Sequence, residues 1–458
     1  MGIFGALTTA VTGMRAQAFA LENISGNIAN SQTIGFKREE TSFIDLIADA
    51  NPAQQLAGQV AVNSRSTNTV QGDIQNASIS TYMAVNGDGY FVVEKPTGFS
   101  GSTPAFGGGQ LYSRRGDFNT DRNGFLVNGA GYYLKGIPVD PTTGNLLGST
   151  PQILQFSNSF LPAQPTSTIN YEANLPSYPL TIGHDVTIPQ SELLQPGNYP
   201  GGDPRVAGTG IVVGSDVSQF LNDSISGGAV TAYDASGAAA NVQLRWAKTD
   251  SYAAGGTDTW NLFYQTDSTA TGATAAWVNA GVDYTFGTNS QMLTPGATVS
   301  LTGVTVDGVS LGNITLQHGT GGMTQFADNG GTVQVNAIAQ DGFAAGALKS
   351  VSVNDKGRVV GTYSNGRTID LAEVTLASFN GPNNLKRLDG GAFAETSDSG
   401  PPNFSASGKI VASSLEGSNS DIGDEFTKLI VTQQAYSANT KVITTSNQMV
   451  QDLLNTLR

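Results

Sequence analysis

The 458-residue sequence has no cysteine, only two histidines and no long apolar run. Without cysteine the chain cannot form disulfides or thiolate metal sites, and its compartment stays undecided between cytoplasm and exterior. Two histidines, His184 and His318, are too few for a histidine metal cluster and for most acid–base pairs. A membrane span needs about 18 consecutive apolar residues, so we expect no membrane insertion.

Positive charge is also scarce, because 22 Lys and Arg stand against 36 Asp and Glu and the formal net charge is -14. Nucleic acid and anionic membrane surfaces repel such a protein, so neither is expected as a partner. The N-terminus lacks a basic region followed by a continuous apolar core. We therefore expect no cleaved secretory signal peptide.

Charge of either sign is scarce near the N-terminus, where Arg15 and Glu22 are the only charged residues through Phe36. Apolar residues recur there every seven positions, with a second line three residues ahead of the first. The two lines are Leu7, Met14, Leu21 and Ile28, and Phe4, Val11 and Ala18. This pattern predicts a helix with the a/d seam of a coiled coil.

The C-terminal segment repeats the pattern. Asp421, Asp424 and Glu425 suit the start of a helix and Arg458 suits its end. The pattern predicts Leu429 inside the seam and Thr432 one helical step outside it. One heptad line and its companions are Ile422, Leu429, Tyr436, Ile443, Val450 and Leu457, with Phe426 and Leu454 beside them.

The two helices either pack against each other or each cover a β domain as ordinary core. A pair of helices still exposes its outer faces, and here these faces carry Ser, Thr, Gln and Asn in place of charge. Uncharged outer faces indicate further protein neighbours, most simply copies of the same chain.

Between the helices the sequence favours β structure, with Asn-Gly turns typical of hairpins at Asn86, Asn123, Asn128 and Asn365 and a further turn at 355–357. The middle of the chain contains Trp246, Trp260 and Trp277 and shows no helical period. We expect an α+β, multidomain fold in which paired terminal coiled-coil-like helices enclose nested, discontinuous all-β domains. The expected parts are terminal helices at 1–31 and 421–458, extended connectors at 32–75 and 405–420, an inner β domain at 76–155 and 341–404, and an outer inserted β domain at 156–340.

Two segments resemble known catalytic or metal-binding motifs, but each lacks residues that the motif requires. The Asn119–Ala130 stretch resembles half of a calcium loop but has Ala130 where a bidentate Glu is needed. Gly308–Gly312 matches the G-x-S-x-G nucleophile elbow, yet a strand pattern follows and no acid precedes His318. We predict no catalytic, cofactor or metal site, although a pair of carboxylates, as in a secreted carbohydrate-active enzyme, stays open as an alternative.

Two long motifs at opposite ends carry a resemblance. Asn27-Ile28-Ala29-Asn30-Ser31-Gln32-Thr33-Ile34-Gly35-Phe36-Lys37 closely resembles the N-terminal signature of the bacterial flagellar rod and hook axial family, and Gln434–Thr445 is similar to its C-terminal signature. The ending Leu453-Leu454 with Arg458, and the blocks Gly89–Val93, Tyr112–Phe118 and Tyr363–Arg367, resemble hook members in particular. The middle of the chain resembles the family only loosely.

The resemblance implies a structural, non-enzymatic subunit that polymerises with its own copies into the flagellar hook, a curved tube that acts as a universal joint. It also implies contacts with rod, hook-cap and hook–filament junction proteins, and export outside the cell through the flagellar type III apparatus. Asn30, Gly35 and Phe36 join the two heptad lines as predicted self-assembly residues. A distal rod or hook–filament junction protein of the same family is the alternative.

Overall fold

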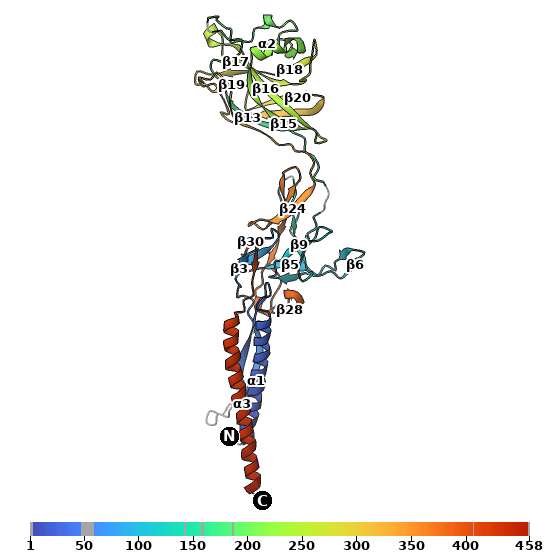
Figure 1. Cartoon of the computed structure of the whole chain (residues 1–458), viewed down its shortest axis with the longest axis vertical. Helices are drawn as coiled ribbons and strands as arrows, with labels where there is room; N and C mark the ends of the chain where they lie inside the picture. The colour runs from blue at the N-terminus through green and yellow to red at the C-terminus, as the bar shows by residue number, and fades with distance from the viewer. Residues whose placement is uncertain are drawn as a thin grey trace. The chain divides into compact units, whose positions relative to one another are not determined.

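The computed structural model describes residues 3–46, 59–141, 143–156, 160–185, 187–405 and 407–456. The chain forms two compact units, which Figure 1 shows. Unit 1 comprises Met1–Ser159 and Leu348–Arg458, and unit 2 comprises Phe160–Ala347. The described residues are mostly β, with three α-helices of which two are terminal. Unit 1 is therefore discontinuous, with unit 2 inserted into it.

The terminal helices of unit 1 are α1 (Ile3–Ala29) and α3 (Ile422–Thr456). Asp421 caps α3 by accepting a hydrogen bond from the Asp424 backbone N–H at 2.9 Å. Strands β1 (Glu39–Leu46) and β2 (Gln59–Ser66) form an antiparallel pair. Asn23 of α1 donates hydrogen bonds to Thr41 and Ser64, so this hairpin lies along α1.

The segments expected to be extended connectors, 32–75 and 405–420, both contain paired strands. β1 and β2 lie in segment 32–75. Segment 405–420 contributes one strand to each of two short antiparallel pairs. These pairs are β3 (Ile74–Asn76) with β31 (Ser414–Glu416), and β4 (Met83–Asn86) with β30 (Lys409–Ala412). The hydrogen bonds between paired strands join backbone groups and do not depend on the side chains. Strands of three or four residues with polar side chains therefore show no hydrophobic alternation in the sequence.

The body of unit 1 is a 12-stranded sheet, and the hairpin of β6 (Gly98–Ser100) and β7 (Thr103–Ala105) extends from it. Residues on both sides of the insertion contribute strands, because β11 pairs with both β5 and β26. Its main path runs β24 (Leu348–Val353), β25 (Arg358–Tyr363), β26 (Thr368–Val374), β11 (Tyr133–Pro138), β5 (Tyr90–Glu94), β8 (Leu111–Ser113), β29 (Ala392–Ala394) and β28 (Lys386–Leu388), with β9 (Phe118–Thr120), β10 (Leu126–Asn128), β12 (Gln152–Ile153) and β27 (Leu376–Ala377) attached.

The predicted turns form hairpins at four of the five positions. The turns at Asn123, Asn128, 355–357 and Asn365 join β9–β10, β10–β11, β24–β25 and β25–β26. Gly124 and Gly366 have positive φ angles of 83° and 80°, which glycine adopts without strain. The turn at Asn86 differs, because it separates β4 from β5 and these strands pair with other partners.

Unit 2 contains two sheets and the helix α2 (Val217–Asn222). The five-stranded sheet consists of β20 (Thr298–Val306), β21 (Val309–Gln317), β13 (Thr168–Asn174), β22 (Met323–Thr324) and β23 (Gln334–Gln340). The six-stranded sheet consists of β14 (Ile211–Val213), β18 (Ala275–Phe286), β17 (Thr259–Gln265), β16 (Ala239–Asp250), β15 (Ile225–Tyr233) and β19 (Met292–Thr294).

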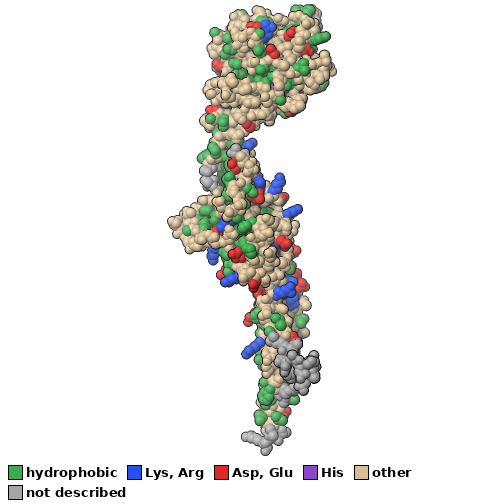
Figure 2. All heavy atoms as spheres, turned by 180° about the vertical axis from the view of Figure 1, so that it is seen from behind, with side chains coloured by type: hydrophobic (Ala, Val, Ile, Leu, Met, Phe, Trp, Pro, Cys, Tyr) green, Lys and Arg blue, Asp and Glu red, His purple; other side chains and the backbone are tan. Residues whose placement is uncertain are grey.

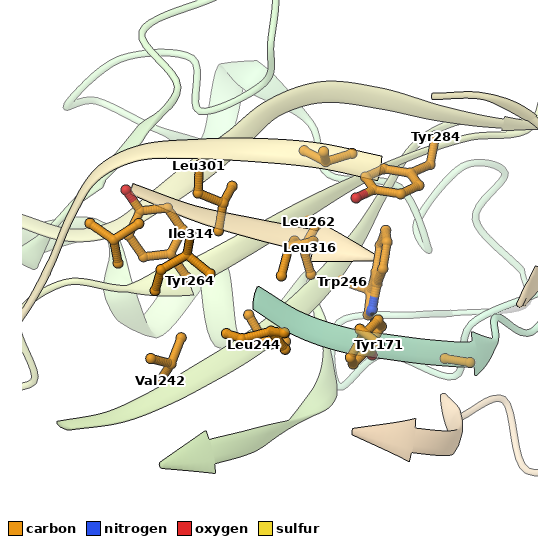
Figure 3. Packing of buried hydrophobic residues seen from close by; sticks show 14 of the residues in the cluster. Tyr171, Val242, Leu244, Trp246, Leu262, Tyr264, Tyr284, Leu301, Ile314 and Leu316 are labelled. Carbon is orange, nitrogen blue, oxygen red and sulfur yellow. Dashed lines mark hydrogen bonds between the residues drawn. The ribbon is translucent and has the colours of Figure 1, made fainter. Parts of the chain in front are cut away.

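Strand β17 shows how the unit 2 core is arranged. Side chains alternate between the two faces of a strand, so Trp260 and Leu262 point into the core shared by the two sheets. Phe263 points the other way and packs against Phe220 of α2, with ring centroids 4.8 Å apart. Both faces of this strand are therefore covered. Figure 3 shows the shared core.

The motifs that resembled active sites are ordinary strand turns. The Gly308–Gly312 segment belongs to the β20–β21 hairpin, and 119–123 belongs to the β9–β10 hairpin. His318 is fully buried, with Nδ1 2.9 Å from the Tyr171 carbonyl oxygen and Nε2 2.9 Å from the Tyr284 hydroxyl. Tyr284 donates to Nε2 when the ring is neutral and Nδ1 carries the hydrogen. Burial lowers the pKa of His318, while the hydrogen bond to Tyr171 opposes that shift.

This arrangement predicts that unit 2 loses stability in mild acid. Below about pH 6.5 an unfolded histidine binds a proton that folded His318 binds poorly, so the free energy of unfolding falls by up to about 1.4 kcal/mol per pH unit. The three tryptophans all lie in unit 2, so urea unfolding followed by tryptophan fluorescence reports on this unit.

The matched control is His318→Gln, which stays neutral at every pH and keeps His184 unchanged. Between pH 7.5 and pH 5.5 the parent should lose more stability than the variant, whatever the starting stability of each. Equal losses would show that His318 does not titrate on unfolding.

Candidate assembly surface

The two terminal helices face each other along an antiparallel seam. Asn27 of α1 donates to the Glu425 carboxylate at 3.1 Å, near the start of α3. Fourteen residues along each helix, a Cβ on Gly13 would lie 3.1 Å from the side chain of Asn439. The two helices therefore keep the same register over two heptads, and glycine leaves room for the Asn439 amide.

Small and polar residues fill the buried centre of this seam. On α3 the buried line is Glu425, Thr432 and Ser446, and these residues are separated by seven or fourteen positions. On α1 the buried residues are Ala10, Ala16, Ala20, Ile24 and Asn27. Small side chains let two helix backbones approach closely, and a polar residue at a buried position specifies register.

The Asn27 side chain closes one end of the seam. Its Nδ2 donates to the backbone carbonyl of Glu39 at 2.8 Å, and its Oδ1 accepts from the Glu39 N–H at 2.9 Å. Lys428 lies 2.7 Å from Glu425 and balances that buried carboxylate. One amide therefore joins the end of α1, the start of β1 and the start of α3.

The predicted assembly residues occupy the flanks of the seam. Leu7, Val11, Met14, Leu21 and Ile28 of α1 are half-buried, as are Leu429, Ile443 and Val450 of α3. Phe4 is 75 % exposed, and Ile422, Phe426, Tyr436 and Leu454 are also exposed. Leu457 lies outside the described residues.

The seven-residue period is present, but its phase differs from the prediction by one residue. The buried α1 line passes through Gly13, Ala20 and Asn27, one position before Met14, Leu21 and Ile28. Gly and Ala contribute little to a hydrophobic pattern. The larger apolar residues next to them in the sequence therefore led to a heptad phase that is wrong by one residue. Thr432, expected outside the seam, is only 9 % exposed, whereas the expected companions Phe426 and Leu454 are 50 % and 59 % exposed.

The exposed surface of α3 has many large apolar side chains, and the central part of this helix is nearly uncharged. Lys441 is the single charged residue from Leu429 to Gln451. Figure 2 shows hydrophobic side chains at the surface of the helical part. The exposed large apolar residues of α3 are Ile422, Phe426, Ile430, Val431, Tyr436, Val442, Met449, Leu453 and Leu454. Nine large apolar side chains exposed on one helix indicate a surface that contacts other protein.

The junction between the helices and the sheet is built on Glu416. Its carboxylate lies 2.5 Å from Lys37 Nζ and 3.2 Å from Arg114 Nη1, and all three side chains are buried. The Gly72 N–H donates to the same carboxylate at 3.0 Å. Burial lowers the pKa of Lys37, while Glu416 opposes that shift. Sequence reasoning placed Lys37 in a motif but missed this cluster, because nothing in the sequence links Glu416 with Arg114.

Asn30, Gly35 and Phe36 help to build this junction. Gly35 has a φ angle of 67°, and a Cβ there would lie 2.8 Å from the backbone of Arg114 and Arg115. Its N–H donates to the Glu416 carbonyl at 2.8 Å. The Asn30 amide donates to the Gly26 carbonyl at the end of α1. The Phe36 ring lies 4.4 Å from the guanidinium of Arg387.

No part of this surface is arranged for catalysis. Among the described residues, no group of three or more His, Cys, Asp or Glu could hold a metal ion. No described helix is long and apolar enough to cross a membrane. The residues brought together instead set helix register, fix the junction and leave apolar side chains on the outer face. These features are typical of a structural protein.

Comparisons with known proteins specify the family. Three family models match: "Flagellar hook protein FlgE/F/G D1 domain" at residues 84–193, "Flagellar basal body protein FlaE D2 domain" at 224–343 and "Flagellar basal body rod FlgEFG protein C-terminal" at 411–456. The flagellar hook protein FlgE of Brucella suis is 30 % identical over 465 residues, covering 100 % of both chains. That of Salmonella typhimurium is 28 % identical and covers 97 % of this chain and 98 % of the relative.

The chain therefore belongs to the flagellar hook protein FlgE family, which is a family of structural proteins and not of enzymes. The predicted family and the prediction of a non-enzymatic protein are both confirmed. A crystal structure of Helicobacter pylori flagellar hook protein FlgE2 aligns with a TM-score of 0.49 and 14 % identity over 75 % of this chain and 100 % of that chain. This likeness adds nothing to the assignment.

The junction predicts a large effect of a single substitution. Glu416→Gln leaves Lys37 and Arg114 buried without a carboxylate, and breaking a buried ion pair in this way costs about 3–5 kcal/mol. We expect a lower midpoint in urea unfolding of unit 1, followed by far-ultraviolet circular dichroism. Glu395→Gln, at an exposed acid of the same unit, is the matched control. A shared midpoint for the two variants would contradict the assigned role of Glu416.

Proposed function

We propose that this chain is the polymerising subunit of a bacterial flagellar hook, with its terminal helices forming the wall of the tube around an export channel. The observation that carries this proposal is the set of large apolar side chains exposed along α3, where Lys441 is the single charged residue from Leu429 to Gln451. Burying a Leu, Ile or Phe side chain contributes about 1.5–3 kcal/mol. Contacts between copies would cover this face, and its polar residues can hydrogen-bond there without desolvating ions.

The helix pair is the proposed coiled-coil-like inner core, at 1–31 and 421–458. The β parts, at 76–155 with 341–404 and at 156–340, are the proposed outer domains, and their modest polar contacts would let copies shift while the helices keep the tube closed. Such a tube acts as a universal joint. The proposed partners are copies of this chain, the rod, hook-cap and hook–filament junction proteins and the type III export apparatus.

The proposed location is outside the cell, after export without a cleaved signal peptide. The relatives that span the whole chain and bear the hook name favour a hook subunit over a distal rod or junction protein. Membership of a structural family speaks against the carbohydrate-active enzyme.

The exposed face gives the direct test of polymerisation. Replacing both Phe426 and Ile430 with Ser should leave the folded chain as stable as the parent, because both side chains are about half exposed. The same variant should polymerise poorly, because each contact between copies would lose two apolar side chains. Electron microscopy and sedimentation measure the polymer, and Gln433→Ser with Gln434→Ser, at exposed polar positions, is the control. Normal tubes from the Phe426/Ile430 variant would refute the proposed surface.

The seam gives an independent test. Thr432→Asp places a charge at the buried centre of the helix pair, where an unpaired ion costs several kcal/mol. We expect this variant to lose helical circular dichroism and to form no tubes, with the β units intact. Gln433→Asp adds the same charge at the adjacent exposed position and should be milder. If the two variants assemble alike, Thr432 does not lie in the seam of the polymer.

A further inference from the structure

Charge is divided unequally between the two units. Unit 2 contains 14 acidic and 3 basic residues, which gives it a formal net charge of -11. Unit 1 contains 22 acidic and 19 basic residues, for a net charge of only -3. Most of the excess negative charge of the chain therefore belongs to the inserted unit.

All three basic side chains of unit 2 are bound within the unit. Arg205 lies 2.9 Å from the Asp203 carboxylate. Lys248 is buried, 2.9 Å from Asp258, and donates to the Ser177 carbonyl at 2.7 Å. Arg245 donates to the backbone carbonyls of Leu221 and Ser224 and to the Ser224 hydroxyl. None of the three is left to balance the acidic residues spread over the loops of the unit.

Five of these acids lie at turns. The carboxylates of Asp185, Asp234, Asp267, Asp307 and Asp328 each accept a hydrogen bond from a backbone N–H. Hydrogen bonds from Thr187 and Ser236 lower the pKa of Asp185 and Asp234, which keeps both ionised in mild acid. An Asn side chain offers the same acceptor oxygen in such turns. The charge of these residues is therefore not required for these hydrogen bonds.

We propose that unit 2 is an electrostatic spacer between copies of this chain. This inference rests on the proposed function, because a polymer is what brings copies of unit 2 together. Like charges on neighbouring copies of unit 2 repel, while α1 and α3, with a formal net charge of only -1 between them, supply the adhesion. Unit 2 of one copy can then move past another without sticking to it, and the distance between them depends on salt.

The physical reason for the salt dependence is screening. The Debye length is about 8 Å at physiological ionic strength, about 30 Å at 0.01 M and about 3 Å at 1 M. Repulsion between surfaces separated by a few ångströms of water is therefore strong at low salt and weak at high salt. Apolar contacts between helices do not weaken in this way as salt rises.

The experiment uses polymers of the full chain, grown in about 20 mM and about 500 mM NaCl, which span the relevant screening range. Cryo-electron microscopy measures the distance between the centres of unit 2 in neighbouring copies. For the parent we expect this distance to be larger at low salt. The variant with all five turn acids replaced, Asp185→Asn, Asp234→Asn, Asp267→Asn, Asp307→Asn and Asp328→Asn, should lose most of this difference.

The matched control removes five exposed acids of unit 1. These replacements are Asp88→Asn, Asp355→Asn, Asp389→Asn, Glu395→Gln and Asp398→Asn. The control carries the same change in net charge and should keep the salt response of the parent. A parent distance that does not change with salt, or a control that loses the response as fully as the unit 2 variant, would overturn the spacer.

Failure of the proposed function would look different, because the parent chain would then form no polymer at all. In that event light scattering of the dissolved chain tests the repulsion directly. The second virial coefficient of the parent should fall from low to high salt by more than that of the unit 2 variant. Equal changes for the two chains would overturn the spacer without any polymer.

Discussion

The buried carboxylate of Glu416 joins the two segments that connect the terminal helices to the sheet of unit 1. Taking an ion out of water is expensive, and here Lys37, Arg114 and the Gly72 N–H compensate for it. Lys37 lies in the segment that leaves α1, and Glu416 lies in the segment that leads to α3. This contact therefore fixes the end of α1 relative to the start of α3, close to the end of the seam where Asn27 contacts Glu425.

The seam itself contributes little apolar burial, because its centre is small and polar. Long helices of this composition have marginal stability unless they pack against other elements. Here some packing contacts lie within the chain, and other helix surface is left exposed. The Asn27 amide and the β1–β2 hairpin anchor α1 within the chain. The large side chains of α3 are left on the outside. The arrangement satisfies register inside one copy and leaves hydrophobic surface for contacts with others.

The sequence predicts features whose signal is local and fails where the signal is absent. Asn-Gly turns and the seven-residue period could be predicted, because each depends on residues that are close in the sequence. The seam phase could not, since Gly13 and Ala20 carry little hydrophobic signal. The pairs β3–β31 and β4–β30 could not either, because they join residues more than 300 positions apart through backbone groups. The Glu416 cluster could not be predicted for the same reason, because Lys37 and Arg114 lie 379 and 302 positions away from Glu416 in the sequence.

Charge is distributed in the opposite way to hydrophobic exposure. Large apolar side chains are exposed on α3, and α1 and α3 together have a formal net charge of only -1, whereas unit 2 buries Trp246, Trp260 and Tyr284 between two sheets and has most of the net charge. In the proposed polymer, an adhesive unit 2 would bind neighbouring copies without selectivity, and helices of high net charge would resist packing against each other. If adhesion is confined to α1 and α3, as proposed, helix shape and register select the contacts between copies. The inserted unit is then free to differ in size and surface without disturbing those contacts.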